Sequence, residues 1–223
     1  MSFSSVVKNE LCRLENVDNC CMISELAAAI CLNGTAAPVT GGGFNIRIVT
    51  ENAAFARRVF SNIKKLFGIN PEVTIRKSRK LKKHVSYILY ITPSIGSQKI
   101  LDATGVTVNT LSGTQTPELS VKIESLLKNK CCSKAFLRGA FLAGGSISDP
   151  EKTYHLELTS RTRTQAQEIK KILNSFDLNA RIIKRKGSYV TYLKEGENIV
   201  DFLNIAGAHL ALMELENIRI LKD

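Results

Sequence analysis

Hydrophobic and polar residues along the chain alternate with two different spacings. Residues 44–50 and 154–160 carry an apolar side chain at every second position, which is typical of a half-buried strand. The segments 51–69 and 160–178 instead repeat apolar residues every three or four positions, as an amphipathic helix does. The same criteria predict further strands at 72–78, 84–91, 180–186 and 188–194, and further helices at 4–16, 20–35, 131–146 and 207–223.

The chain contains this pattern twice. When CCMISELAAAICLNGT (20–35) is placed over CCSKAFLRGAFLAGGS (131–146), both stretches open on paired cysteines and close on glycine and a hydroxyl residue. The order helix, strand, helix, two strands then recurs at nearly the same offset, which indicates an internal repeat. We therefore predict two copies related by a pseudo-twofold axis, with the helices 20–35 and 131–146 side by side.

Small side chains in these two helices indicate a close contact between them. Gly139 lies in the middle of its helix, where glycine costs about 1 kcal/mol relative to alanine. Ala143 follows one turn later, and Ala28 lies in the other helix. Small residues at this spacing allow two helix backbones to approach closely. An ordinary core helix with incidental small residues is the alternative, and the repeat favours the contact.

Composition and charge narrow the class of partner. The chain has 223 residues, of which 44% are hydrophobic, and a formal net charge of +11. A basic excess of this size favours a polyanionic partner, whether DNA, RNA or an acidic membrane face. No apolar run approaches the roughly 18 residues needed to cross a bilayer, and the first residues lack the layout of a signal peptide. We expect a cytosolic protein with reduced thiols.

Six cysteines raise the question of a metal site. They are Cys12, Cys31 and the adjacent pairs Cys20-Cys21 and Cys131-Cys132. A zinc site is expected to show a Cys-x2-Cys spacing or nearby histidines, and the three histidines are distant in the sequence. The prediction is that the cysteines are buried as small apolar side chains and hold no metal.

At this point a resemblance to a known family becomes visible. Residues 26–34, LAAAICLNG, and 137–145, LRGAFLAGG, resemble the motif that opens each half of the LAGLIDADG homing endonucleases. The resemblance implies an α+β fold with two α-β-β-α-β-β-α repeats that form a saddle. In active members, the eighth motif residue is an acid that binds divalent metal. Asn33 and Gly144 occupy that position here, which implies a non-catalytic protein, because two-metal cleavage needs carboxylate ligands.

The wording of ELAAAICLNGT and AFLRGAFLAGGSISDPEK is more specifically similar to the WhiA family. The resemblance covers nearly the whole chain. It implies a DNA-binding regulator of transcription in cell division, sporulation and chromosome segregation, whose homing-endonuclease-like part precedes a helix-turn-helix domain. The predicted organisation is 1–104 for a first helix and the first repeat, 105–120 for a polar linker, 121–215 for the second repeat, and 216–223 for the start of a link to that further domain.

Basic residues gather at equivalent hairpin positions in the two copies, as two arms that could straddle a duplex. Residues 76–84 are the densest run, and Gly187-Ser188 suits a tight turn in the second hairpin. Such side chains contact phosphates with little sequence preference. A solvated basic loop that touches nothing is the alternative. The predicted DNA-binding residues are Arg47 in the first sheet, Arg76, Lys77, Arg79, Lys80, Lys82 and Lys83 in the first arm, and Lys184, Arg185 and Lys186 in the second.

One residue argues against a fully preserved saddle. The counterpart of Arg47 in the second copy is Glu157, and a carboxylate there is expected to repel phosphate. The leading prediction is a monomer with internal pseudo-symmetry that binds double-stranded DNA weakly at the nucleoid, without a cofactor, metal or membrane contact. A protein-interaction module and a residual nuclease with relocated acids stay open as alternatives.

Overall fold

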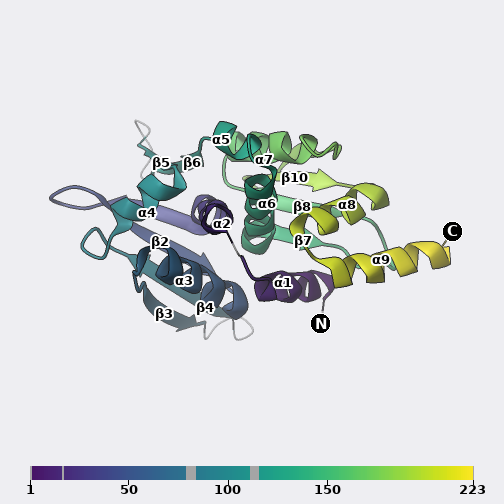
Figure 1. Cartoon of the computed structure of the whole chain (residues 1–223), viewed down its shortest axis with the longest axis horizontal. Coiled ribbons are helices and arrows are strands. Elements are labelled where there is room, and N and C mark those ends of the chain that lie inside the picture. Colours follow the sequence, from purple (N-terminus) through teal and green to yellow (C-terminus); the bar gives the residue numbers. More distant parts are fainter. Residues whose placement is uncertain (1, 17, 79–83, 111–115, 223) are drawn as a thin grey trace.

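The fold consists of helices and antiparallel sheets arranged as two similar halves (Figure 1). The computed structural model describes residues 2–16, 18–78, 84–110 and 116–222. The first repeat comprises α2 (Asn19–Asn33), β1 (Gly34–Pro38), β2 (Phe44–Thr50), α3 (Ala53–Phe67), β3 (Glu72–Lys77), β4 (Val85–Ile91) and α4 (Ser97–Thr104). The second comprises α6 (Lys130–Gly144), β7 (Gly145–Ile147), β8 (Leu156–Ser160), α7 (Arg163–Asn174), β9 (Arg181–Arg185), β10 (Ser188–Leu193) and α8 (Gly196–Ala206).

These two orders of elements confirm the predicted α+β fold. Each repeat runs helix, strand, strand, helix, strand, strand, helix. The strand orders are also equivalent, with β1-β2-β4-β3 in the first sheet and β7-β8-β10-β9 in the second, and the paired strands are antiparallel. The edge strands β3 and β9 are therefore counterparts.

Equivalent caps begin the helices that follow the second strand of each repeat. The Asn52 side chain accepts a hydrogen bond of 3.1 Å from the Phe55 backbone N–H at the start of α3. The Thr162 side chain accepts one of 3.2 Å from the Gln165 N–H at the start of α7. Such caps satisfy backbone donors that a helix cannot satisfy internally. The two repeats thus share local detail as well as element order.

Helices α2 and α6 lie side by side at the centre of the molecule (Figure 1). Every residue from Leu26 to Leu32 is buried, which suits a helix that is apolar on all sides. On α6, Phe136, Leu137 and Phe141 are at most 2% exposed, and the Phe141 ring packs 5.7 Å from that of Phe202 on α8. One continuous core therefore joins the two repeats through these helices.

The remaining elements frame the repeats. Strands β5 (Val106–Asn109) and β6 (Glu118–Val121) pair antiparallel, with Val106 opposite Val121 and both side chains buried. They occupy both ends of the segment 105–120, where the sequence pattern predicts only a polar linker. The helices outside the repeats are α1 (Phe3–Arg13), α5 (Glu124–Leu127) and α9 (His209–Lys222), and the hairpin strands are β5 (Val106–Asn109) and β6 (Glu118–Val121).

Candidate nucleic-acid interface

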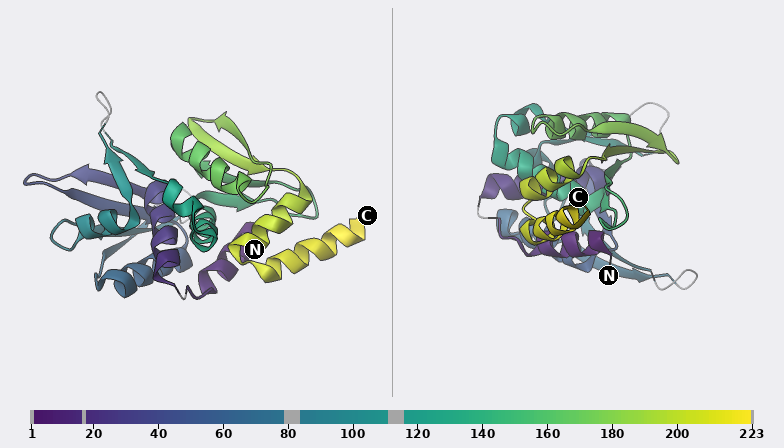
Figure 2. Two further views of the ribbon diagram at one scale, coloured as in Figure 1. Left: turned by 45° about the horizontal axis from the view of Figure 1, so that its top comes forward. Right: turned by 90° about the vertical axis from the view of Figure 1, so that its right-hand side faces the viewer.

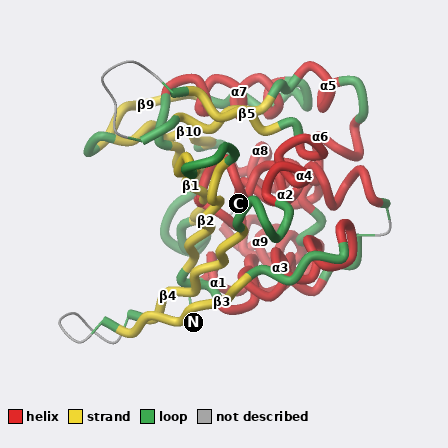
Figure 3. The backbone as a smooth tube through the Cα atoms, turned by 90° about the vertical axis from the view of Figure 1, so that its left-hand side faces the viewer, coloured by secondary structure: helices red, strands yellow, loops and turns green. Residues whose placement is uncertain are grey.

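Each sheet has one face against the helices and one face away from them, which we call the open face. In β2, Ile46, Ile48 and Thr50 are buried toward the core, so Asn45, Arg47 and Val49 point the other way. In Figure 3 most strands lie along the left of the picture and most helices lie to their right. The β3–β4 and β9–β10 hairpins project from this same side at its two ends (Figures 2 and 3).

Arg47 lies in a row of side chains that crosses the first sheet on its open face. It pairs with Thr35 on one side and Tyr90 on the other, and Tyr90 pairs with Glu72 on the edge strand. The Arg47 guanidinium lies 6.0 Å from the centre of the Tyr90 ring. This contact holds the cation over the sheet surface.

The second sheet has the matching row with its charges exchanged. Glu157 pairs with Ser146 and with Tyr192, and Tyr192 pairs with Arg181 on the edge strand. The arginine and the glutamate have thus traded places between centre and edge. Each sheet carries one cation and one carboxylate in this row, so the loss of a cation at Glu157 is compensated at Arg181.

The Glu157 carboxylate moreover has two polar neighbours. Its carboxylate accepts a hydrogen bond of 2.8 Å from Arg185 Nη2, and His155 Nε2 lies 3.1 Å from its other oxygen. Burial alone would raise the pKa of Glu157, but the bonds from Arg185 and His155 outweigh burial and the pKa lies below its ordinary value. Glu157 is therefore paired with Arg185, which reduces the repulsion of phosphate expected from this carboxylate. Its effect on DNA binding stays a prediction.

Register separates the predicted arm residues into two sets. Arg76 pairs with Ser86 and Arg185 with Ser188, at equivalent places on the open faces, and both arginines are exposed. Lys77 and Lys184 each lie one residue away on the same strands, so they point to the opposite face. Lys184 Nζ lies 5.7 Å from the ring of Tyr189 there.

The tip of the second arm is a two-residue turn at Lys186-Gly187. Both residues have positive φ, 49° for Lys186 and 81° for Gly187, and Ser188 already belongs to β10. The predicted turn at Gly187-Ser188 was one residue out of register. Positive φ at both central positions is the geometry that matches the twist of paired strands. The predicted residues Arg79, Lys80, Lys82 and Lys83 lie outside the described residues.

The two positions that hold metal in active endonucleases lie at the ends of α2 and α6. A Cβ added to Gly144 would lie 2.7 Å from the Thr159 carbonyl oxygen, so no side chain fits there without a shift. Asn33 lines a hollow of about 860 Å³ together with Ala143 and Lys8. Burial lowers the pKa of Lys8. An asparagine and a glycine in place of two carboxylates, with a lysine nearby, are a poor donor set for a hard divalent cation.

The predicted helix contact brings Ala28 and Gly139 together. A Cβ added to Gly139 would lie 2.6 Å from the Glu25 carbonyl oxygen and 3.0 Å from Ala28 Cβ. A methyl group is therefore already too large at this point of the interface. Ala143, one turn further along α6, is half-buried and lines the hollow beside Asn33.

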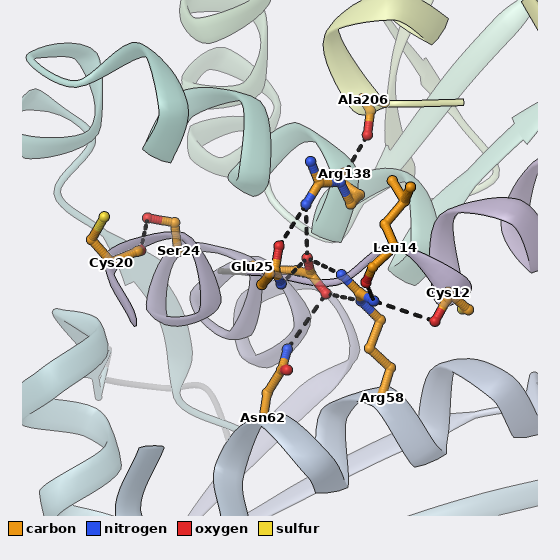
Figure 4. Close-up of polar contacts among 10 residues, drawn as sticks. Cys12, Leu14, Cys20, Ser24, Glu25, Arg58, Asn62, Arg138 and Ala206 are labelled. Carbon is orange, nitrogen blue, oxygen red and sulfur yellow. Dashed lines mark hydrogen bonds and ion pairs between the residues drawn. The ribbon is translucent and has the colours of Figure 1, made fainter. Parts of the chain in front are cut away.

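The sequence pattern did not predict a buried polar cluster that lies beside this contact (Figure 4). Glu25 is 2% exposed and accepts hydrogen bonds from Arg58 Nη2 at 3.0 Å and Asn16 Nδ2 at 2.9 Å. Arg138 of α6 donates to Asn16 Oδ1 and to the Ala206 carbonyl, both at 2.7 Å. The cluster therefore connects α2 and α3 of the first repeat with α6 and α8 of the second. Its members are far apart in the sequence, and no spacing between them predicts that they meet.

The cysteines are less buried than predicted. The thiol sulfurs of Cys20, Cys21 and Cys131 lie within 4.8 Å of one another, where α2 and α6 begin. Burial as small apolar side chains therefore describes only part of the set. Cys20 is exposed, Cys12, Cys21 and Cys131 are half-buried, and Cys31 and Cys132 are buried.

Within the described residues, no helix combines the length and the apolar character of a membrane span.

Comparison with known proteins gives the family. The profile of the WhiA N-terminal LAGLIDADG-like domain matches residues 19–107, and that of the WhiA LAGLIDADG-like domain matches 133–223. The "Probable cell division protein WhiA" of Ruminiclostridium cellulolyticum is 54% identical over all of this chain, which covers 69% of that protein.

Solved structures agree in fold. The crystal structure of full-length DUF199/WhiA from Thermatoga maritima superposes with a TM-score of 0.74 at 23% identity, over 100% of this chain and 68% of that one. The crystal structure of I-DmoI in complex with DNA and Mn superposes with a TM-score of 0.55 at 12% identity, over 85% of this chain and 97% of that one. The chain belongs to the WhiA family, and both its repeats are LAGLIDADG-like.

Proposed function

We propose that this chain binds double-stranded DNA on its open sheet faces without cutting it, as part of a regulator of transcription in cell division and sporulation. The observation that supports it is the equivalent placement of Arg76 and Arg185 on hairpins that project from one side of the molecule. Arg47 and Arg181 add charge between them. A homing endonuclease of this fold, I-DmoI, has been crystallised with DNA.

The distribution of charge suits phosphate contacts rather than reading of bases. The four arginine residues are exposed or half-buried, and the chain carries a net charge of +11. Phosphate contacts alone give non-specific dissociation constants of about 10⁻⁴ to 10⁻⁶ M at physiological salt. The proposal accordingly places the chain in the cytoplasm at the nucleoid, as a monomer with weak affinity for any duplex.

The absence of cleavage is part of the same proposal. It is supported by the lack of space at Gly144, where a carboxylate side chain would meet the Thr159 backbone. It is also supported by the position of Lys8, which lines the same hollow as Asn33. Purified chain incubated with supercoiled plasmid and Mg²⁺ or Mn²⁺ should leave the plasmid intact over hours. Nicking that follows the protein through purification, and that disappears on substitution of one of its carboxylates, would contradict the proposal and favour a nuclease with relocated acids.

A protein-interaction module is the second candidate, and an apolar groove favours it. Val73 and Ile75 on the helix side of β3 are 50% and 56% exposed, and they line a hollow of about 420 Å³ with Phe60. Exposed apolar surface on an edge strand is typical of an interaction site. Salt-dependent binding of duplex DNA by this chain would favour the first candidate. Undetectable binding at low salt would favour the second.

A further inference from the structure

The cysteines at the start of the two central helices come from equivalent positions of the repeat. Cys20 and Cys21 lie in the first turn of α2, and Cys131 and Cys132 lie in the first turn of α6. Because α2 and α6 pack side by side, the four residues meet at one end of the interface. Three of their sulfurs lie within 4.8 Å of one another. Cys132 follows Cys131 in the same turn of α6 and is buried, but its sulfur is not one of these three.

This spacing is close to that of ligands around one metal ion. Zinc binds thiolates at about 2.3 Å, which separates two sulfurs of a tetrahedral site by about 3.8 Å. Sulfurs already within 4.8 Å can reach this arrangement by rotation of short side chains. All four thiols are free, Cys20 is exposed and Cys131 is half-buried, so an ion has a path of entry.

The local backbone also suits thiolates. The start of a helix carries unpaired N–H groups and a partial positive charge, which favours a nearby anion. At α2 the N-cap residue Asp18 makes no side-chain capping bond, and its carbonyl oxygen accepts from the Cys21 and Met22 N–H groups. At α6 Asn129 caps the helix, accepting from the Cys131 N–H at 3.2 Å. The cysteines thus lie at two helix starts, and only the start of α2 lacks a side-chain cap.

We propose that Cys20, Cys21, Cys131 and Cys132 form a binding site for a thiolate-preferring divalent metal, zinc above all, that joins the two repeats. Four sulfur ligands select zinc over the hard cations that carboxylates bind. The site is separate from the lost endonuclease positions. Asn33 lies 12 or more residues further along α2, which corresponds to about 18 Å of helix. The metal would hold the interface at one end, with the Ala28–Gly139 contact nearer its middle.

Cobalt(II) is the probe of choice, because it occupies zinc sites and its thiolate complexes absorb strongly. Reduced, metal-free chain should bind about one equivalent of Co²⁺ with thiolate-to-cobalt charge-transfer absorption, and Zn²⁺ should displace it. Zn²⁺ should also raise Tm, because a ligand that binds only the folded state stabilises it. Cys21→Ser and Cys131→Ser should each weaken cobalt binding by at least about tenfold.

Two matched controls carry the same substitution elsewhere. Cys12→Ser and Cys31→Ser remove a thiol outside the group and should bind cobalt as the parent does, with folding of all four variants checked by circular dichroism. Cobalt binding without charge-transfer absorption, or equal binding by Cys131→Ser and the parent, would overturn the proposal. So would a reduced chain that binds no cobalt but forms a disulfide between α2 and α6 on mild oxidation, which would assign the thiols a redox role instead.

Discussion

Individual carboxylates in this chain are governed by what surrounds them. Glu25 is enclosed by arginine and asparagine donors, and Glu157 by Arg185 and His155. Glu168 on α7 has the opposite surroundings. Burial, with the nearby carboxylates of Glu124 and Glu118, raises the pKa of Glu168 to about 7. The same residue type thus stabilises the fold in one place and opposes it in another.

Glu168→Gln should stabilise the chain, and only at higher pH. A carboxyl whose pKa is raised on folding contributes stability below its unfolded pKa and loses it as pH rises through the folded value of about 7. Since Glu168 is only half-buried, we expect a gain of about 1 kcal/mol, or about 2–4 °C in Tm, at about pH 8 and almost none at about pH 5. Thermal melts at both pH values measure this. Exposed Glu214 on α9 is the matched control, and Glu214→Gln should leave Tm unchanged.

At the scale of elements, the contact between α2 and α6 decides the architecture. It depends on the absence of a side chain at Gly139, which leaves room for the backbone at Glu25 and for Ala28. The cost of a glycine in a helix is about 1 kcal/mol, and close packing of two long helices exceeds it. A small residue in this helix is therefore a requirement of the interface.

Gly139→Leu should lower the free energy of unfolding by at least about 1–3 kcal/mol, because overpacking forces the helices apart. Gly139→Ala should also destabilise, although alanine favours a helix. Gly196→Ala at the start of α8 is the control, since its Cβ would lie 3.3 Å from the flexible Arg219 side chain and in ordinary contact, at 3.6 Å, with the Tyr154 ring. Urea unfolding of the three variants gives the comparison. An unchanged midpoint for Gly139→Leu would show that the helices do not meet at this residue.

Elements with a full hydrophobic period were predictable, and short or tertiary features were not. Helices α3 and α7 and strands β2, β3, β4, β9 and β10 follow their patterns closely. Strand β7 has 3 residues, which is too short for a period, and only the family resemblance implied it. Strands β5 and β6 lie in a stretch rich in polar residues, where burial of Val106 and Leu119 outweighed the composition. The predicted boundaries at 104, 120 and 215 stay predictions.

For the candidate site residues, strand register shows which face of the sheet each side chain lies on, and sequence spacing alone did not. The sequence places Arg76 and Lys77 in one basic run, but strand geometry sends them to opposite faces. The Glu25 cluster and the thiol group depend on residues that meet only in three dimensions. Partners separated by about a hundred residues leave no local pattern, although the repeat did indicate that the two cysteine pairs are equivalent.

On the scale of the whole molecule, the two repeats form one body through shared core and shared polar bonds. The Glu25 carboxylate on α2 lies 3.5 Å from Arg138 Nη1 on α6. Its negative charge therefore interacts with arginines of both repeats. Removal of one partner from a buried ion pair leaves the others unpaired in a medium that solvates charge poorly. The integrity of this centre keeps the two open faces in a fixed relation.

Glu25→Gln should therefore destabilise the whole chain by about 3–5 kcal/mol, because Arg58 and Arg138 would lose their counter-charge. The unfolding transition should stay single, since the repeats share one core. Glu216→Gln, which removes a partner of Arg219 near the surface, should cost less than about 1 kcal/mol. Chemical unfolding followed by circular dichroism measures both. A loss for Glu25→Gln no greater than that for Glu216→Gln would contradict the role of the cluster.

The central claim, that DNA lies on the open sheet faces, is tested most directly by duplex titration of two matched triple variants. Arg47→Gln/Arg76→Gln/Arg185→Gln removes three cations from the open faces. Lys77→Gln/Lys184→Gln/Lys99→Gln removes two cations from the opposite faces of the sheets and one, the exposed Lys99, from α4. The account predicts that the first variant binds unrelated sequences more weakly, and by an equal factor for each. Its salt dependence should flatten by about one unit of slope for each phosphate that is no longer neutralised. The second variant should bind nearly as the parent does. Equal affinity and equal slope for the two variants would contradict it.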